Sequence, residues 1–254
     1  MDIAEAGSPS GLPLTGERTV PGVAGENYWY RRHEAAYLAV VPHCAGATVL
    51  DAGCGEGYGA DLLARTARRV LAVDYDELTA AHVARTYPQV EVIRSNLAML
   101  PITGAAVDVV VSMQVIEHLW DQKAFLAECR RVLRPGGQLL ITTPNRLTFS
   151  PGSDTPLNPF HTRELAPLEL AELLSAAGFT VRSLRGLRHG PKLRELDDRL
   201  GGSIIEAQVR LAVTGTPPAA DLLTAVASVA SEDFVITDED LDGSLDLVAI
   251  AVAP

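Results

Sequence analysis

The sequence predicts an α/β fold in which a seven-stranded, mostly parallel sheet carries helices on both faces. Short apolar runs rich in Val, Leu and Ile alternate along the chain with stretches whose apolar residues have helical spacing. A glycine-rich segment follows the first of these runs, where a strand passes directly into a helix. Alternating strands and helices are joined by right-handed crossovers, so the strands are expected to lie parallel in one sheet.

The expected elements follow this rhythm in chain order. Helices are predicted over residues 26–41, 58–67, 80–85, 121–133 and 167–177, and strands over 48–50, 70–73, 90–93, 107–112, 138–142, 179–187 and 245–252. Gly178 is the expected C′ glycine of the last helix, and Pro135-Gly136-Gly137 breaks the chain before the fifth strand. The long segment 188–243 is interpreted as an insertion that serves as a lid, a dimer contact or a structural appendage.

The chain is expected to form a single domain over residues 26–254. With 254 residues, 47% of them hydrophobic, it can bury one substantial core. Residues 1–25 are rich in Gly, Pro, Ser and Thr and have no hydrophobic period, which is typical of an arm that is flexible or ordered by a ligand.

The composition excludes several classes of function. A net charge of -11 leaves no excess of cations for a phosphate backbone, so no nucleic acid partner is expected. The N-terminus lacks the basic and apolar regions of a secretory signal, and no apolar run is long enough to span a bilayer. We therefore expect a cytoplasmic protein with no membrane partner. Its three cysteines show no paired spacing and are interpreted as reduced thiols.

A carboxylate and three alternating glycines follow the first strand. Asp51 precedes Gly53, Gly55 and Gly57, and a helix is expected to begin at Tyr58. Glycine lets the backbone approach a ligand where a Cβ would collide, and the helix N-terminus offers free N–H groups. A dinucleotide would place its pyrophosphate here, whereas the ammonium group of S-adenosylmethionine benefits from a nearby carboxylate. The acidic residue therefore favours S-adenosylmethionine over NAD.

A second carboxylate, Asp74, ends the second strand. A carboxylate at this place in Rossmann-like sites accepts hydrogen bonds from both ribose hydroxyls of the cofactor. We predict that Asp74 is the ribose ligand and that Tyr75, which follows it, belongs to the same site.

These motifs resemble the class I methyltransferases, a family with a Rossmann-like fold. The resemblance runs from about residue 49 to 187 and resumes at the last strand; its motifs also include the Leu-Arg-Pro-Gly-Gly turn at 133–137. It implies an adenine-binding turn at Ser95-Asn96-Leu97 and a motif after the fourth strand that begins at Gln114, so Asn96, Leu97 and Gln114 are expected to contact the cofactor. Asn96 departs from the family's usual Asp; its carbonyl accepts the same hydrogen bond without the charge.

His118 and His161 are the candidate bases for an oxygen acceptor. Both lie in segments that follow strand C-termini, the edge where open α/β sheets bind ligands. A neutral histidine can take a hydroxyl proton near pH 7, but each could instead pack or cap a helix. Alternatively, Glu117 together with His118 orients the acceptor or, with Asp154 as well, holds Mg²⁺. Carboxylates this scattered do not define a metal site, so none is assigned.

The N-terminal arm and the first predicted helix bring further candidates. Arg18 or Arg32 is expected to pair with the cofactor's carboxylate, and Tyr28 and Trp29 to close over the cofactor or stack on a sugar. The alternative is a helix packed by its aromatic residues, with solvated arginines. Four other histidines are interpreted as surface or loop residues, the last of them alternatively at the border of the pocket: His33, His43, His82 and His189.

Over nearly the whole chain the sequence also resembles the actinobacterial sugar 1-O-methyltransferase of methylmannose polysaccharide synthesis. The similar segments are 14–19, 26–33, 150–164, 201–205 and 242–250. The resemblance implies an oligosaccharide substrate, methylated at the reducing-end 1-hydroxyl of a short α-1,4-(3-O-methyl)mannoside. A methyltransferase acting on a phenol or quinone stays open as an alternative, as does a catalytically silent cofactor-binding partner subunit. A homodimer is also considered.

Overall fold

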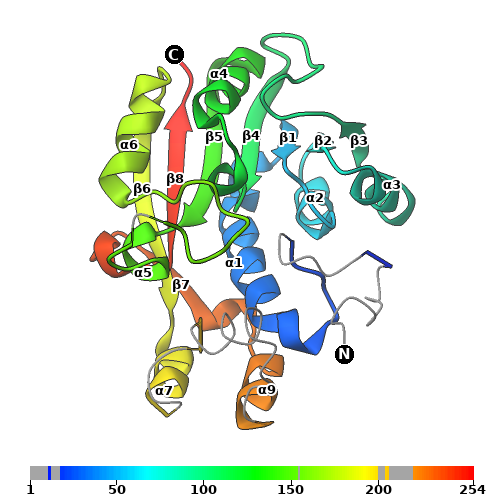
Figure 1. Ribbon diagram of the computed structural model, residues 1–254. Helices are drawn as coiled ribbons and strands as arrows, with labels where there is room; N and C mark the ends of the chain where they lie inside the picture. Colours follow the sequence, from blue (N-terminus) through cyan, green and yellow to red (C-terminus); the bar gives the residue numbers. More distant parts are fainter. Residues whose placement is uncertain (1–10, 13–17, 154, 200–203, 206–219) are drawn as a thin grey trace.

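One sheet of eight strands organises the computed structural model, which describes residues 11–12, 18–153, 155–199, 204–205 and 220–254 (Figure 1). The strand order is β3-β2-β1-β4-β5-β8-β6-β7. The strands are β1 (Thr48–Ala52), β2 (Arg69–Asp74), β3 (Glu91–Arg94), β4 (Val107–Met113), β5 (Leu133–Pro144), β6 (Thr180–His189), β7 (Phe234–Thr237) and β8 (Asp246–Val252).

Helices and short 3-10 turns connect these strands. The helices are α1 (Asn27–Cys44), α2 (Tyr58–Ala64), α3 (Glu77–Thr86), α4 (Gln122–Val132), α5 (Arg146–Phe149), α6 (Pro167–Ala176), α7 (Pro191–Arg199) and α9 (Ala220–Ala227), and the 3-10 turns are η2 (Ala24–Glu26), η3 (Ile116–His118), η4 (Ser231–Asp233) and η5 (Leu241–Gly243). None of the described helices has the length and apolar character needed to cross a bilayer.

Parallel pairing dominates one half of the sheet and antiparallel pairing the other. β1 to β5 pair in parallel, as the alternation of strands and helices predicts. β8 lies antiparallel between β5 and β6, and β7 lies antiparallel along β6. The predicted Rossmann-like fold is confirmed.

The sheet has eight strands rather than the predicted seven. The additional strand, β7, belongs to the segment interpreted as an insertion and pairs with residues 186–189 of β6. Its run Phe-Val-Ile-Thr is only four residues long and follows a polar 3-10 turn, so it gave a weak sequence signal.

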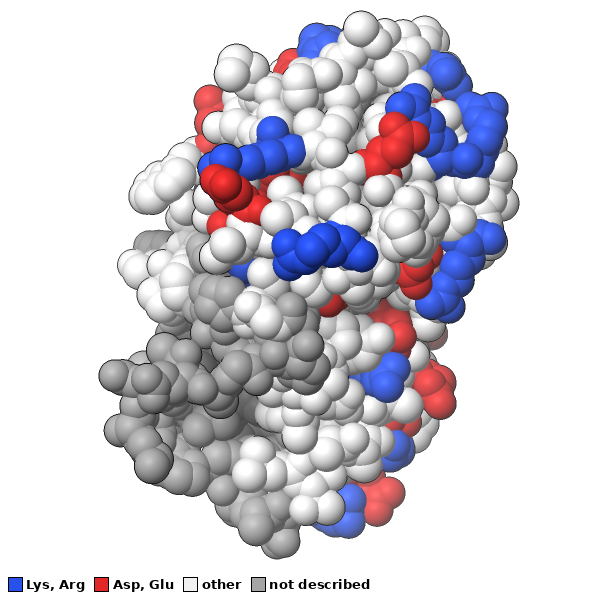
Figure 2. Space-filling model, turned by 90° about the vertical axis from the view of Figure 1, so that its right-hand side faces the viewer, with Lys and Arg blue, Asp and Glu red and all other residues white. Residues whose placement is uncertain are grey.

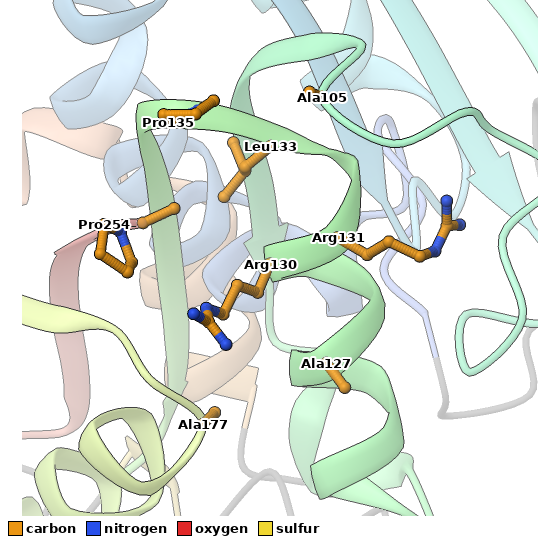
Figure 3. Close-up of a pocket in the computed structure, with 9 residues that line it drawn as sticks. Ala105, Ala127, Arg130, Arg131, Leu133, Pro135, Ala177 and Pro254 are labelled. Atoms are coloured by element: carbon orange, nitrogen blue, oxygen red, sulfur yellow. The ribbon is translucent and has the colours of Figure 1, made fainter.

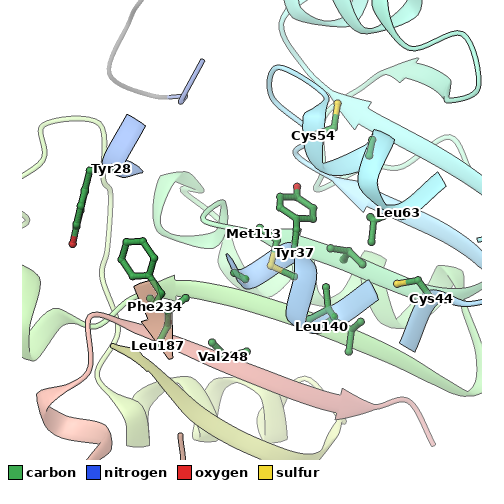
Figure 4. Packing of buried hydrophobic residues seen from close by; sticks show 14 of the residues in the cluster. Tyr28, Tyr37, Cys44, Cys54, Leu63, Met113, Leu140, Leu187, Phe234 and Val248 are labelled. Atoms are coloured by element: carbon green, nitrogen blue, oxygen red, sulfur yellow. The ribbon is translucent and has the colours of Figure 1, made fainter. Parts of the chain in front are cut away.

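The two faces of the sheet bury separate apolar layers. On one face, Tyr37 of α1 packs in a cluster with Leu63 of α2, Met113 and Leu140, which Figure 4 shows close by. On the other face, apolar residues of α4 and α6 pack against alternate residues of the same strands. Because successive strand residues point to opposite faces, the side chain of Asp51 lies on the same face of the sheet as that of Val49 and points toward α1.

The segment expected to be an N-terminal arm falls partly outside the described residues. Leu12 and Val20 are buried where the structure does describe it. Asp154 and residues 201–203, which also entered the sequence interpretation, lie outside the described residues.

Candidate active site

The glycine loop after β1 combines tight packing with one open position. Gly53, Gly55 and Gly57 all have positive φ, which favours glycine. A Cβ on Gly53 would lie 2.6 Å from Val115, whereas a Cβ on Gly55 would meet nothing within 4 Å. The loop is therefore held against the protein at its start and open at Gly55, a cradle that suits a bound ligand.

Asp51 places a buried carboxylate beside this loop. The residue is fully buried at the end of β1, and the Tyr37 hydroxyl donates to its two oxygens at 3.2 and 3.3 Å. Burial raises the pKa of Asp51 to about 7 because the charged form has lost its water. An ammonium group beside it would favour the charged form. The residue thus fits the amino acid end of S-adenosylmethionine.

Asp74 is fixed by backbone N–H groups. The Gly55 amide donates to its Oδ2 and the Asp76 amide to its Oδ1, both at 3.0 Å. Each oxygen keeps a second lone pair, so the carboxylate can still accept from two ribose hydroxyls. Burial raises the pKa of Asp74, and Arg18 lies close enough to Asp76 for an ion pair at 3.3 Å.

The other predicted cofactor residues follow the ends of β2, β3 and β4. Tyr75 is 68% exposed beside Asp74, and Leu97 is buried. The Asn96 side chain accepts from the Ala98 amide at 2.8 Å. Gln114 adopts φ 58°, a conformation that side-chain-bearing residues rarely adopt, and its amide donates to Thr142. Their roles in binding stay predictions.

Arg32 has a different partner from the predicted cofactor carboxylate. Its side chain is 2% exposed and ion-paired with Asp246 of β8, with Nε 2.6 Å from Oδ2. A second nitrogen donates to the carbonyl oxygen of Leu245 at 3.0 Å. In the structure this arginine therefore joins α1 to the last strand.

Glu117, His118 and His161 come together at the carboxyl end of β4, and we call them the acceptor cluster. One ligand atom from each lies within 4.8 Å of the others, and the two imidazole rings meet edge to face at 4.8 Å between centroids. Glu117 and His118 lie in η3. Thr162 anchors the segment of His161 to it, since its amide donates to the carbonyl oxygen of Glu117 at 2.7 Å.

Hydrogen bonds to its neighbours orient the His161 ring. Its Nδ1 lies 2.7 Å from Glu164 and its Nε2 lies 3.1 Å from Nδ2 of Asn158. Because Oδ1 of Asn158 accepts from the Phe160 amide, the amide NH₂ must face the ring. These contacts assign the proton to Nδ1, which donates to Glu164, and the lone pair to Nε2.

His118 has the same tautomer. Its Nδ1 lies 3.1 Å from the carbonyl oxygen of Phe160, which can only accept, so the lone pair is on Nε2. Burial, together with the charge of a protonated His161, lowers the pKa of His118 to about 4. The ring is neutral at pH 7 and holds a proton less readily than an ordinary histidine.

Glu117 brings a buried carboxylate to the same cluster. Oε2 accepts from Thr143 at 3.0 Å, and Oε1 has no partner within the described part of the chain. Burial raises the pKa of Glu117 to about 7. With two imidazoles, the group could hold a metal ion, but such donors suit Zn²⁺, Fe²⁺ or Mn²⁺ better than Mg²⁺, which prefers oxygen ligands.

The surface or loop interpretation of the other histidines is wrong for three of the four. His33 lies within α1, part-buried and 3.3 Å from the Tyr58 hydroxyl. His82 is buried on α3, 2.8 Å from Glu56. His189 is buried at the end of β6, and its two ring nitrogens lie 2.7 Å from Tyr28 and Asp197. His43 is exposed, as expected.

A separate hollow of about 390 Å³ lies at the other end of the strands (Figure 3). Pro135, at the start of β5, and Pro254, after β8, line it together with Arg130 and Arg131. It is at the opposite edge of the sheet from the glycine loop, and we assign it no part in the chemistry. On the face shown in Figure 2, basic side chains lie among acidic ones and form no continuous basic band over the described residues.

Several neighbours of the site had no sequence signal that set them apart. Tyr37 was expected only as part of the predicted helix over residues 26–41, and Glu164 and Asn158 only as part of the segment 150–164. The spacing of Asn158, His161 and Glu164, three residues apart each time, was the one available hint. Thr143 lies in a buried strand, and nothing in the sequence marks it as a neighbour of the site.

The chain resembles some known proteins in sequence and others in fold. The family model described as a methyltransferase domain matches residues 50–141. A "Probable S-adenosylmethionine-dependent methyltransferase" of Mycolicibacterium smegmatis is 62% identical over 97% of both chains, and one of Mycobacterium tuberculosis is 57% identical over 99% of this chain and 93% of its own. Among solved structures, a Burkholderia thailandensis 1,6-didemethyltoxoflavin-N1-methyltransferase shares the fold, with a TM-score of 0.55 at 21% identity over 90% of this chain and 82% of its own.

The fold and these relatives define the class of protein. The chain belongs to the S-adenosylmethionine-dependent methyltransferases of class I, and it is an enzyme that transfers methyl groups.

Proposed function

We propose that this enzyme methylates a sugar hydroxyl at the acceptor cluster. The observation that carries the proposal is His161, whose Nδ1 donates to Glu164 while its ring lies in one cluster with Glu117 and His118. A carboxylate behind an imidazole stabilises the imidazolium that forms when the ring takes a proton. An alcohol needs such a base, because an oxygen acceptor must lose its proton during transfer.

In the proposed mechanism some residues bind the cofactor and others remove the proton of the acceptor. S-adenosylmethionine, when bound, supplies the methyl group of its sulfonium. In the proposed arrangement Asp51 holds the ammonium group and Asp74 the ribose, while the glycine loop lets the backbone come close. Nε2 of His161 then takes the acceptor proton, after its contact with Asn158 is given up, and Glu164 keeps the ring aligned. Glu117 and His118 position the acceptor for in-line attack.

The loop that carries His161 supports a polyhydroxyl acceptor. Residues 150–164 are densely polar and contain three prolines and one glycine. The finer proposal, from the sequence resemblance, is the reducing-end 1-hydroxyl of a short α-1,4-(3-O-methyl)mannoside. An anomeric hydroxyl is more acidic than an ordinary alcohol, so a histidine base is sufficient.

A phenol or quinone acceptor is the second candidate. A ubiquinone biosynthesis O-methyltransferase of Acinetobacter baumannii is 31% identical over 58% of this chain and 69% of its own. That similarity favours O-methylation of a small molecule in general. It leaves out a large part of the chain, whereas the sugar resemblance extends over nearly all of it.

Acceptor profiling tests the proposal. Purified enzyme with labelled S-adenosylmethionine is offered 3-O-methylated α-1,4-mannobiose, maltose as its epimeric control, and a catechol, and products are assigned by mass and linkage analysis. Parallel assays with EDTA, Mg²⁺ or Mn²⁺ decide whether the cluster acts with a cation, and light scattering tests the homodimer. Methylation of the catechol alone would overturn the sugar proposal. Cofactor binding without transfer to any acceptor would instead favour a silent binding module.

A further inference from the structure

We infer that the hollow beside Trp120 is a second carbohydrate subsite, which binds a sugar unit of the acceptor chain next to the one being methylated. The inference rests on the proposed sugar acceptor and deepens it: the substrate is an oligosaccharide that reaches beyond the acceptor cluster. The hollow has a volume of about 220 Å³, comparable to a single sugar ring, and is lined by Leu119, Trp120, Asp121, Gln122, Lys123, Thr162, Arg163 and Leu173.

Trp120 offers an unused aromatic face at this hollow. It is 94% exposed in a chain with only two tryptophans, and it lies between η3 and α4. A tryptophan this exposed at the wall of a concave site leaves its ring available for contact with a ligand. Aromatic rings combine a large apolar surface with a specific geometry, which suits stacking on the C–H face of a sugar.

A buried acceptor atom on the same wall points to a hydroxyl ligand. Gln122 is 6% exposed, and its Nε2 donates to the carbonyl oxygens of Ile116 and Arg163, both at 3.0 Å. Its Oε1 is left without a partner among the described residues. An unsatisfied buried carbonyl is costly, and a ligand O–H that reached it would relieve that cost.

The position of the hollow connects it to the chemistry. Leu119 and Thr162 line it, and each directly follows a histidine of the acceptor cluster in the chain. The Thr162 hydroxyl donates to the carbonyl oxygens of Glu117 and Leu119 and so joins the two walls. Asp121, Lys123 and Arg163 add polar groups of both charges at the rim, which suit a neutral polyhydroxyl rather than an anion.

Fluorescence gives a direct test of binding, separate from turnover. Trp29→Phe leaves Trp120 as the sole tryptophan, and α-1,4-mannosides from the disaccharide upward are titrated in the presence of S-adenosylhomocysteine. We expect a saturable blue shift of Trp120 emission whose half-saturating concentration falls with chain length. No shift with any of these sugars, up to their solubility, would overturn the subsite.

Kinetics with matched variants complete the test. Trp120→Ala should raise KM for the mannosides from the disaccharide upward about tenfold and leave KM for the monosaccharide 3-O-methylmannose and the affinity for S-adenosylhomocysteine unchanged, while Trp120→Phe should recover most of the loss. Val235→Ala removes an exposed apolar side chain from β7 and is the control. Equal length dependence in Trp120→Ala and the parent would overturn the subsite while leaving sugar methylation intact. Failure to methylate any sugar would instead overturn the proposed function.

Discussion

The glycine loop and the acceptor cluster lie at the same edge of the sheet but are built in different ways. Around the loop, Asp74 is satisfied by two backbone amides and the three glycines alternate between positions 53 and 57. The acceptor cluster joins η3 to a residue more than forty positions later and leaves Oε1 of Glu117 without a partner in the described chain. A site made by one local turn can be identified from its motif, whereas a site made by distant segments depends on how the chain folds between them.

The largest expected effect separates the two regions by removing the proposed base. His161→Ala should lower kcat by about 10³-fold, within the usual range for a general base, and leave the affinity for S-adenosylhomocysteine unchanged. Calorimetry and steady-state rates measure the two quantities. His43→Ala, at an exposed ring, is the control. Near-normal turnover of His161→Ala would assign the base to His118 or to solvent.

The converse variant acts on the cofactor side. Asp74→Ala should weaken S-adenosylhomocysteine binding about 30-fold, because two hydrogen bonds to a charged acceptor are lost. At saturating cofactor, kcat should be nearly that of the parent. The exposed Glu77→Ala, three residues along the chain, should bind normally. An unchanged Kd for Asp74→Ala would contradict the proposal that Asp74 binds the ribose.

A pH titration sharpens the comparison, because Asp51 is protonated more readily than an ordinary aspartate. Its pKa in the free protein is raised to about 7, so below that pH a proton must leave before the carboxylate can pair with an ammonium group. Affinity for S-adenosylhomocysteine should therefore rise about 20-fold between roughly pH 5.5 and 7.5 and then level off. Asp51→Asn should bind weakly with a flat profile. Equal slopes in both proteins would contradict the assignment.

The raised pKa of Asp51 also makes the stability of the protein depend on pH. The unfolded chain releases this proton near the ordinary pKa of 3.8 and the folded chain near 7, so the unfolded state binds fewer protons between these values. The free energy of unfolding of the ligand-free protein therefore loses a contribution as pH rises through this window. Urea denaturation of the parent and of Asp51→Asn at the two ends of the window measures that contribution.

The smallest expected effect concerns the group behind the base. Glu164→Gln keeps an acceptor for the Nδ1 proton but removes the charge, so kcat should fall about tenfold. KM for the acceptor should stay near that of the parent, because the carboxylate acts on the ring that takes the proton and not on binding of the acceptor. Glu164→Asp should restore part of the rate. A rise in KM with an unchanged kcat would indicate that Glu164 only holds the loop in place.

The difference between the two regions also explains what the sequence could predict. Seven of the strands, the helices α1 to α4 and α6, and the glycine loop follow from local periodicity and turn chemistry, whereas β7 and the helices α5, α7 and α9 were not located. His118 and His161 were chosen as candidates because both follow strand ends, but their contact with each other was not predictable. Asn158 and Glu164 act through a fold of the loop that no local pattern specifies. His82 and His189 were misassigned because their buried partners, Glu56 and Tyr28, come from other segments of the chain.

The placement of β8 has a consequence for how the protein folds. β5 ends at Pro144 and β8 begins only at Asp246, yet β8 lies between β5 and β6 in the interior of the sheet, and Asp246 neutralises the buried Arg32 of α1. Until residues 246–252 take their place, the sheet has an open slot and Arg32 lacks its counterion. Closure of the sheet therefore depends on contacts between segments far apart in the chain, which are slow to form.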